Sequence, residues 1–175
     1  MLDGAGAPDW VRAAAAADAL AWEGRFGVAT DVSGLRCEAN LFRYVPADTH
    51  IRWDGVSDDA LARVCAARLL AGGSGVVSTP VALPPGLAEA LDVEGIGLCV
   101  ETWEACVARA GTQPGGRIRL VGGASNDSHG TASVAVYAHE VTANATLELL
   151  PFLKEQAVSM TAHRFGTPQR HMVAM

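Results

Sequence analysis

The sequence has little of what marks a nucleic-acid-binding protein. Its only lysine is Lys154, charged residues make up 18% of the 175 residues and aromatic residues 6%. The formal net charge is −6, and no run of basic residues occurs. A protein that binds nucleic acid needs a basic surface for the phosphates. We therefore expect no nucleic-acid partner.

Long hydrophobic runs and clustered cysteines are missing as well. No apolar run approaches the roughly 18 residues that a membrane span requires, and the N-terminus lacks the basic and apolar regions of a secretion signal. Cys37, Cys65, Cys99 and Cys106 show no C-x-x-C spacing and no neighbouring histidine, so we interpret them as reduced, buried, small apolar residues. These absences predict a cytoplasmic protein without a membrane span or a metal site.

The usual motifs of nucleotide-binding and nucleophilic sites are also absent. No G-x-G-x-x-G follows the first expected strand of the alternating region, and neither G-K-[ST] nor G-x-S-x-G occurs. His163 and His171 are separated by Gly166 and Pro168, so they do not share a helix face. The adjacent carboxylates Asp58 and Asp59 are explained by a helix start. We expect no catalytic, cofactor-binding or metal-binding residue in this chain.

The sequence predicts an alanine-rich helix from Asp9 to about Phe26. The 3.6-residue period assigns the core face and the solvent face of this helix. The core face is expected to contain Trp10, Ala14, Ala17, Ala21 and Phe26, and the solvent face Asp18, Glu23 and Arg25.

Strand-like and helix-like segments alternate after an extended segment over Arg36–Pro46, which we interpret as an edge strand. Helices are expected to begin after Ser57, Pro84 and Thr102. The strands are expected at Thr49–Trp53, Val76–Ser78, Gly97–Val100, Arg117–Val121 and Ala132–Ala138. Crossover helices between strands predict an α/β fold with a Rossmann-like, mainly parallel sheet and helices on both faces.

The C-terminal part changes in character. Glu140–Ala143 and Thr146–Leu150 are short β-prone runs that predict a hairpin. A helix that starts at the next proline would place Phe152, Gln156 and Met160 on one face. We divide the chain into an N-terminal helix and linker (1–34), a Rossmann-like non-catalytic domain (35–138), and a β-hairpin with a C-terminal docking tail (139–175).

Two motifs resemble a known family. Asp31-x-x-Gly-Leu-x-x-Glu-x-Asn-x-x-Arg-Tyr44, followed by Pro46, resembles the segment that opens the C-terminal domain of long bifunctional proline-utilisation proteins. The run from Leu150 to Gly166 resembles the motif that closes these proteins, and the helix from Trp10 to Phe26 fits the same region. These proteins fuse proline dehydrogenase to L-glutamate γ-semialdehyde dehydrogenase, which is also called 1-pyrroline-5-carboxylate dehydrogenase.

The resemblance implies a non-catalytic domain of the aldehyde dehydrogenase superfamily. Its fold would resemble the NAD-binding domain without the catalytic or cofactor-binding residues. In the family, the terminal hairpin and tail pack on the dehydrogenase domain and help to cover the cavity through which the semialdehyde travels. The parent enzyme uses FAD to oxidise proline and NAD to oxidise the semialdehyde to glutamate. The partner would therefore be a dehydrogenase domain of proline catabolism, in cis or in trans.

The closing segment carries the expected partner interface. An arginine presents several hydrogen-bond donors to carboxylates, and aromatic side chains fill pockets on a partner. The interface residues we expect are Phe152, Gln156, His163, Arg164, Phe165 and Gly166. Three alternatives stay open. In the first alternative, the closing segment caps the sheet of this chain itself. In the second, the chain is an independent NAD(P)- or nucleotide-binding oxidoreductase domain. In the third, the chain forms a homo-oligomer through the 140–150 hairpin.

Overall fold

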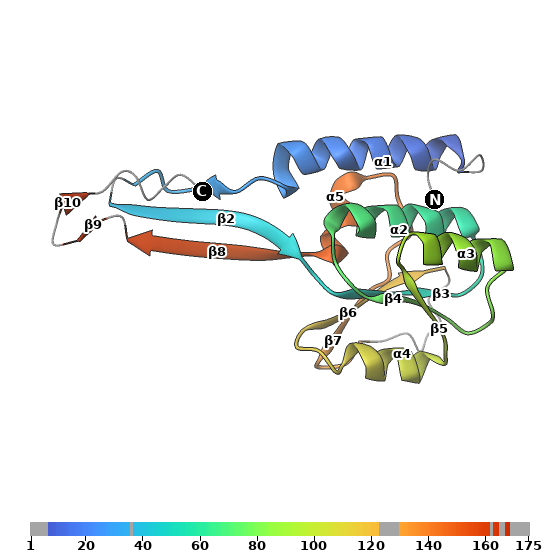
Figure 1. Ribbon diagram of the computed structural model, residues 1–175. Helices are drawn as coiled ribbons and strands as arrows, with labels where there is room; N and C mark the ends of the chain where they lie inside the picture. The colour runs from blue at the N-terminus through green and yellow to red at the C-terminus, as the bar shows by residue number, and fades with distance from the viewer. Residues whose placement is uncertain (1–6, 36, 123–129, 162, 165–166, 169–175) are drawn as a thin grey trace.

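The protein consists of an α/β body from which a long β-ribbon projects (Figure 1). The computed structural model describes residues 7–35, 37–122, 130–161, 163–164 and 167–168. In Figure 1 the body lies on the right, and the ribbon extends to the left.

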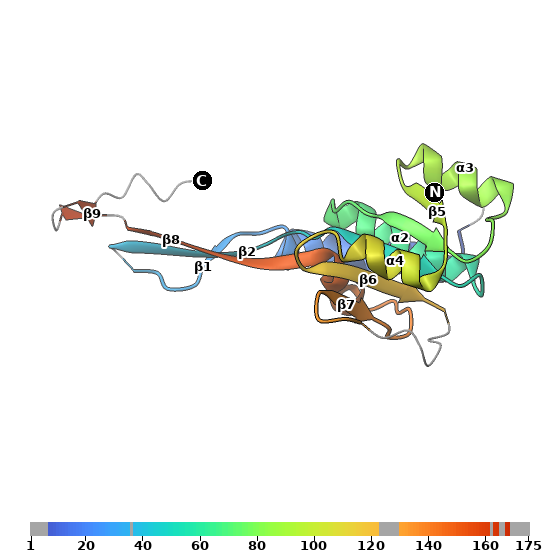
Figure 2. The same cartoon turned by 90° about the horizontal axis from the view of Figure 1, so that it is seen from below.

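The body is built on a five-stranded sheet with the strand order β5-β4-β3-β6-β7. Every neighbouring pair is parallel, as the crossover connections predict. The strands are β3 (Thr49–Trp53), β4 (Val76–Thr79), β5 (Gly97–Val100), β6 (Gly116–Val121) and β7 (Val134–Tyr137). Helices α2 (Asp58–Ala71) and α3 (Pro85–Val93) lie on one side of the sheet, and α4 (Trp103–Ala110) lies on the other (Figures 1 and 2). The predicted Rossmann-like fold class is confirmed.

Local capping sets the helix ends. The Ser57 side chain accepts a hydrogen bond from the Ala60 amide, which starts α2, and the Thr102 side chain accepts one from the Ala105 amide, which starts α4. Gly72 ends α2 with a φ of 76°, a conformation that glycine adopts without a steric cost.

The N-terminal helix is confirmed, but its expected faces are partly wrong. Helix α1 (Asp9–Ala21) continues as the π-helical turn η1 (Trp22–Phe26). Phe26 is buried as expected, whereas Trp10 is 40% exposed and Asp18 is buried. Asp18 was expected to face water because a carboxylate is costly to bury alone. The structure removes this cost by pairing Asp18 with Arg63.

A buried charge network joins α1, α2, β6 and the short helix α5 (Ala145–Leu149). Arg63 forms a bidentate pair with Asp18 at 2.6 and 2.9 Å, and Arg119 forms one with Glu148 at 2.7 and 3.1 Å. Thr142 links the pairs, because its carbonyl accepts from Arg63 Nε at 3.0 Å and its amide donates to Glu148 Oε2 at 3.1 Å. The sheet and three helices are thus held by hydrogen-bonded charges as well as by apolar packing.

Two predictions for the C-terminal part are wrong. Residues 145–149 form α5 and not half of a hairpin, because the Asn144 side chain accepts a hydrogen bond from the Leu147 amide and caps a helix there. The expected helix after residue 150 is instead a 3₁₀ turn, η2 (Leu150–Phe152), followed by the strand β8 (Leu153–Thr161). A C-terminal hairpin does exist, but it is formed by β9 (His163–Arg164) and β10 (Thr167–Pro168).

Strand β2 (Glu38–Pro46) confirms the extended segment, but β2 is not an edge strand. It lies between β1 (Thr30–Asp31) and β8 in a three-stranded sheet. Its partner β8 comes from the other end of the chain, so short-range patterns carry no sign of the pairing. The ribbon therefore joins the predicted segments 35–138 and 139–175 into one structural element.

Candidate partner interface

The ribbon formed by β2 and β8, here called the arm, projects from the body of the fold. The two strands pair antiparallel from Glu38↔Thr161 to Pro46↔Leu153. Each strand has nine residues, which at about 3.4 Å per residue gives an arm of about 30 Å. Strand β1 adds only two residue pairs beside β2. Figures 1 and 2 both show the arm pointing away from the body.

The root of the arm, where β2 and β8 meet the body, is firmly attached. The Ala47 amide donates to the Phe152 carbonyl at 2.8 Å, and the Thr49 hydroxyl donates to the Pro151 carbonyl at 2.8 Å. Arg117 donates from Nη1 to the Leu153 carbonyl at 2.7 Å. The arm thus leaves the sheet in a direction that hydrogen bonds fix.

One face of the arm is mainly apolar. Residues directly opposite each other in an antiparallel pair share a face. Ala39 is buried, and the other apolar side chains of this face are half-buried. The apolar residues of this face are Ala39, Leu41, Val45, Val158 and Met160, and Lys154 lies opposite Val45 at the root end of the same face.

A polar pair crosses the middle of this apolar face. Arg43 lies opposite Gln156, and its Nε donates to Gln156 Oε1 at 2.7 Å. Arg43 is exposed, so its remaining guanidinium N–H groups can reach an acceptor on a partner. Arg43 and Met160 belong to the residue types that are enriched at protein interfaces.

The opposite face of the arm is polar and aromatic. Ser159 Oγ donates to Asn40 Oδ1 at 2.6 Å across the strands. The Phe42 and Tyr44 rings meet edge to face at 5.3 Å, and Tyr44 meets Phe26 at 4.9 Å. Because Phe26 belongs to the body, this contact stiffens the arm near its root.

A two-stranded ribbon is only marginally stable in water when nothing packs on it. An arm of this length with one apolar face therefore gains stability when a second surface covers that face. The expected gain follows the apolar area removed from water, about 25 cal/mol per Å². This makes the apolar face the best candidate for a partner interface.

The expected interface residues are distributed unevenly over the structure. Gln156 lies on the apolar face, as part of the Arg43 pair. Phe152 is fully buried in the body's own core, so its assignment to a partner contact is wrong: its ring has no exposed surface to offer. The backbone of His163 and Arg164 forms β9, and the description does not extend to their side chains. Phe165 and Gly166 lie outside the described residues.

Sequence reasoning missed most of the apolar face. The signal is present in Val158–Thr161, where apolar and polar residues alternate with the period of a strand. The spacing of four between Gln156 and Met160 was interpreted as one helix face. The same spacing is even, so it also places both residues on one strand face. Leu41 and Val45 on β2 show the same even spacing.

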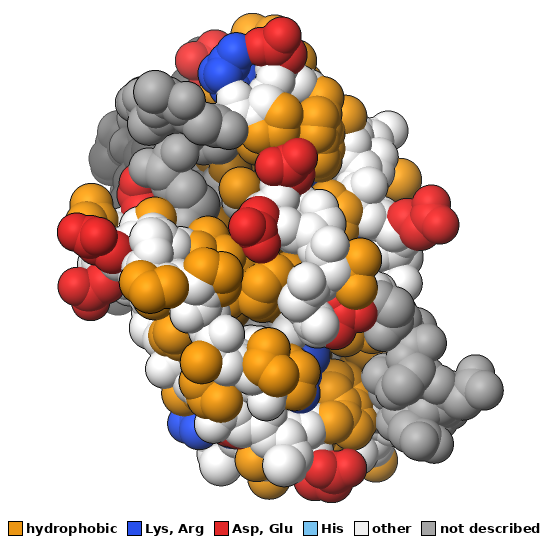
Figure 3. Space-filling view, turned by 90° about the vertical axis from the view of Figure 1, so that its right-hand side faces the viewer, with side chains coloured by type: hydrophobic (Ala, Val, Ile, Leu, Met, Phe, Trp, Pro, Cys, Tyr) orange, Lys and Arg blue, Asp and Glu red, His pale blue; other side chains and the backbone are white. Residues whose placement is uncertain are grey.

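The opposite end of the molecule offers a weaker surface. Strand β5 forms that edge of the sheet, and exposed apolar side chains lie on it and near it: Val81, Val93, Leu98 and Val100. Figure 3 shows this end, where apolar side chains are interspersed with acidic ones. Scattered apolar residues of this kind are common on protein surfaces. The predicted homo-oligomer therefore stays a prediction.

The usual nucleotide position of a Rossmann-like sheet is filled with acidic groups. That position is at the carboxyl ends of β3 and β6, where the strand order reverses. Gly122 follows β6, and a Cβ on it would lie 1.7 Å from Asp54 Oδ1, so the Asp54 carboxylate occupies this space. The adjacent N-terminus of α2 carries Asp58 and Asp59 in its first turn. Three carboxylates at this place repel a pyrophosphate.

Burial disfavours the thiolate form of two of the four cysteines. Cys65 and Cys106 are buried, and burial raises the pKa of Cys65 to about 12 and also raises the pKa of Cys106. Cys99 is half-buried and Cys37 exposed, so the expectation of four buried cysteines is wrong for these two. In the described part of the chain, no three His, Cys, Asp or Glu residues are grouped as metal ligands, and no helix is long and apolar enough to cross a membrane.

His50 makes the stability of the fold pH-dependent. The Val76 amide donates to His50 Nδ1 at 3.2 Å, and burial, followed by the positive charge of Arg109, lowers the pKa of His50 below 6.5. Below about pH 6.5 the unfolded chain binds a proton that the folded chain resists. We predict that the free energy of unfolding falls as the pH drops from about 7 to 5.

Urea unfolding at several pH values tests this dependence. Partial desolvation also lowers the pKa of His139, whose side chain is 35% exposed, so His139→Gln serves as the matched control. His50→Gln should reduce the pH dependence of the free energy of unfolding by the part that the His50 ring contributes. The part that His139 contributes should stay unchanged. An unchanged slope in His50→Gln would show that its ring does not carry the effect.

Comparison with known proteins relates this chain to a solved structure. A scan against protein-family models finds no match, and neither does a search of curated protein sequences. Among solved structures, this chain is similar to proline utilization A (PutA) from Corynebacterium freiburgense, with 32% sequence identity and a TM-score of 0.65. The match covers 94% of this chain and 14% of the PutA chain. The part of PutA that this chain resembles is thus about one seventh of the length of that protein.

Proposed function

We propose that this chain is a non-catalytic module of an L-glutamate γ-semialdehyde dehydrogenase in proline catabolism. It packs on the dehydrogenase domain through its arm and supports the NAD-dependent activity and the channelling of the intermediate. The observation that carries the proposal is the projecting arm with its half-buried apolar face. The similarity to PutA supplies the choice of partner.

The arm suits such a role physically. It presents aliphatic side chains to a partner, and Arg43 can donate to partner carboxylates or carbonyls. The attached root lets the body hold the arm at a set angle, which lowers the entropy lost on docking. In this proposal NAD and FAD are bound by other parts of the enzyme, and the chain binds no cofactor itself.

An independent nucleotide-binding oxidoreductase domain is the competing function. The parallel sheet favours it, because folds of this kind bind nucleotides at the switch point between strands. The carboxylates of Asp54, Asp58 and Asp59 at that position oppose it. Calorimetry of the chain with NAD separates the two functions. Heat of binding at millimolar NAD would favour the domain as an independent nucleotide binder.

Val158→Asp tests the docking function in the dehydrogenase that contains or binds this chain. Docking would bury the new carboxylate without a partner, so we expect a loss of about 2 kcal/mol or about thirtyfold in affinity. NADH production from the semialdehyde and coupled turnover from proline should both fall. The measurements are the two rates and, where the chain acts in trans, the dissociation constant of the complex.

Ser159→Asp is the matched control, because it adds the same charge one residue further along β8 on the polar face. It should leave docking and turnover close to their original values. Equal turnover in both variants, with both folded by circular dichroism, would contradict docking through the apolar face. Point variants are preferable to deletion of residues 150–175, since deletion also removes Phe152 and Leu153 from the core.

A further inference from the structure

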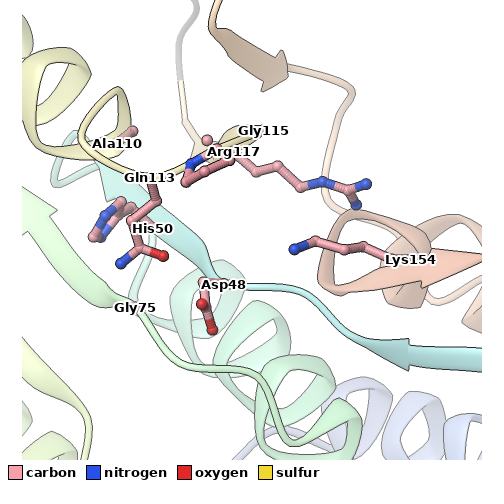
Figure 4. Close-up of a pocket in the computed structure, with 10 residues that line it drawn as sticks. Asp48, His50, Gly75, Ala110, Gln113, Gly115, Arg117 and Lys154 are labelled. Atoms are coloured by element: carbon pink, nitrogen blue, oxygen red, sulfur yellow. The ribbon is translucent and has the colours of Figure 1, made fainter.

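The hollow at the root of the arm is too small for a ligand larger than water (Figure 4). Its volume is about 20 Å³, which holds about one water molecule. The register of β3 and β6 also places the His50 and Arg117 side chains on opposite faces of the sheet, so they do not converge there. The edges of the sheet offer a partner more hydrogen-bonding groups than this hollow does.

The two edge strands of the parallel sheet differ in how far they are covered. At β7, the Thr131 amide donates to the Val134 carbonyl at 3.0 Å, and the Val134 amide donates to the Thr131 carbonyl at 3.3 Å, so the chain before β7 closes part of that edge. Strand β5 has no strand on its outer side among the described residues. The outer edge of β8 belongs to the arm and to the docking proposed above. The open edge of the body is therefore β5.

The pairing with β4 fixes which backbone groups of β5 point outward. Thr79 lies opposite Val100, and the Glu101 amide donates to the Thr79 carbonyl at 2.9 Å. In a parallel ladder every second residue bonds the same neighbour. Cys99 and Glu101 therefore bond β4, whereas the N–H and C=O groups of Leu98 and Val100 point away from it. No hydrogen bond among the described residues engages these four groups.

Strand β5 lacks the features that keep other strands away from an edge. Natural edge strands commonly carry a lysine, a proline or a bulge. Gly97–Val100 contains no charged residue and no proline, and it pairs with β4 without a bulge. On one face of the strand, Leu98 is 36% and Val100 58% exposed. An added strand would cover these two side chains and bond the outward backbone groups, and the four residues of β5 suit a short extended segment.

The charge around β5 indicates what kind of segment would bind. From residue 69 to residue 108 the sequence contains five acidic residues and neither lysine nor arginine. The acidic residues are Glu89, Asp92, Glu94, Glu101 and Glu104. The next basic residue, Arg109, pairs with Glu101. Figure 3 shows acidic side chains among the apolar ones at this end. A second copy of this chain would bring the same negative charge and be repelled, whereas a basic segment would be attracted.

We propose that the β5 edge binds an extended segment of a basic partner protein, which adds a sixth strand to the sheet. The backbone of the segment would bond the outward groups of Leu98 and Val100, and its apolar side chains would lie beside theirs. Lysine or arginine residues of the segment would meet the exposed carboxylates of Glu89, Asp92 and Glu104. Strand β5 and the arm lie at opposite ends of the molecule (Figure 1), so this inference does not depend on docking by the arm.

Titration of the ¹⁵N-labelled 175-residue chain with a synthetic peptide tests the edge by NMR. The probe is the capped peptide Lys-Val-Thr-Val-Thr-Val-Lys, in which apolar and polar side chains alternate between two cations. Saturable shifts of the Leu98 and Val100 amides are expected. A probe with glutamate in place of both lysines should bind at least about tenfold more weakly, because its carboxylates are repelled.

Val100→Pro removes an outward N–H group but no hydrogen bond to β4, so the fold should be kept. Peptide affinity should fall about tenfold, the usual result of losing one hydrogen bond and the close approach of a strand. Val100→Thr is the matched control, because it keeps the N–H group and the branched shape, and its affinity should stay within about threefold of the original. Leu98→Pro removes the other outward donor and replaces Val100→Pro if that variant does not fold.

Three results would overturn the proposal. The first is the absence of saturable shifts at Leu98 and Val100 with the lysine probe. The second is equal affinity for the lysine and glutamate probes, and the third is unchanged affinity in a folded proline variant. Light scattering of the chain alone gives a further check. A dimer that Val100→Pro abolishes would show that the edge binds a second copy of this chain and would also overturn the proposal.

Discussion

Arg119→Met should destabilise the chain by about 3–5 kcal/mol, the usual cost of breaking a buried ion pair from one side. Arg119 and Glu148 are both fully buried, so the variant leaves a carboxylate in the interior without its counter-ion. The guanidinium also donates to the carbonyls of Tyr137 and His139, and these lose their donor. Since domains are commonly stable by only about 5–15 kcal/mol, this is a large share of the total.

Urea unfolding measures this loss, and two further variants identify its cause. Arg119→Met combined with Glu148→Leu removes both charges, and it should recover part of the stability because no buried carboxylate remains unpaired. Recovery is incomplete because the Thr142 amide loses its acceptor. Arg43→Met removes an exposed arginine and should cost less than about 1 kcal/mol. A double variant less stable than Arg119→Met would contradict the ion-pair explanation.

Phe152→Ala is expected to cost about 3–5 kcal/mol of stability, because it leaves a cavity in a close-packed core. Phe152 is the last residue of the short turn η2, and its ring is fully buried in the main cluster. The Phe152 carbonyl also accepts from the Ala47 amide at the root of the arm, so a local collapse would move the root. Thermal and urea unfolding of the chain are the measurements.

Phe42→Ala provides the comparison on the arm. Phe42 is half-buried and makes an edge-to-face contact with Tyr44, a contact worth about 0.5–1.5 kcal/mol beyond area burial. The stability lost in Phe42→Ala should therefore be clearly smaller than the stability lost in Phe152→Ala. Similar losses in the two variants would show that the core does not depend on Phe152 as its burial indicates.

Much of the body follows from local patterns in the sequence. Ser57 and Thr102 cap helices with their own side chains, and Gly72 ends one in the left-handed conformation. Such signals lie within four residues of the feature they determine. The order of strands and helices then leaves few topologies besides a parallel, Rossmann-like sheet.

The arm and the buried charges depend on residues far apart in the chain. Arg43 and Gln156 are 113 positions apart, and Arg63 and Asp18 are 45 apart. No local pattern distinguishes an Asp18 that meets an arginine from one that faces water. Similarly, the run after Pro151 fits a helix period and a strand period equally well, and only pairing with β2 selects the strand.

The sequence separation within the arm has a consequence for folding during synthesis. Arg43 must wait for the residues up to Gln156, 113 positions later, which at about 5–20 residues per second takes about 6–23 s. The strands of the parallel sheet, the last of which ends at Tyr137, have all been synthesised before β8 appears. During that interval β2 has an unpaired edge on the side that β8 later covers, and such edges recruit other chains. The arm thus forms only after every strand of the parallel sheet has been made, and its β2 edge is where a nascent chain needs protection until then.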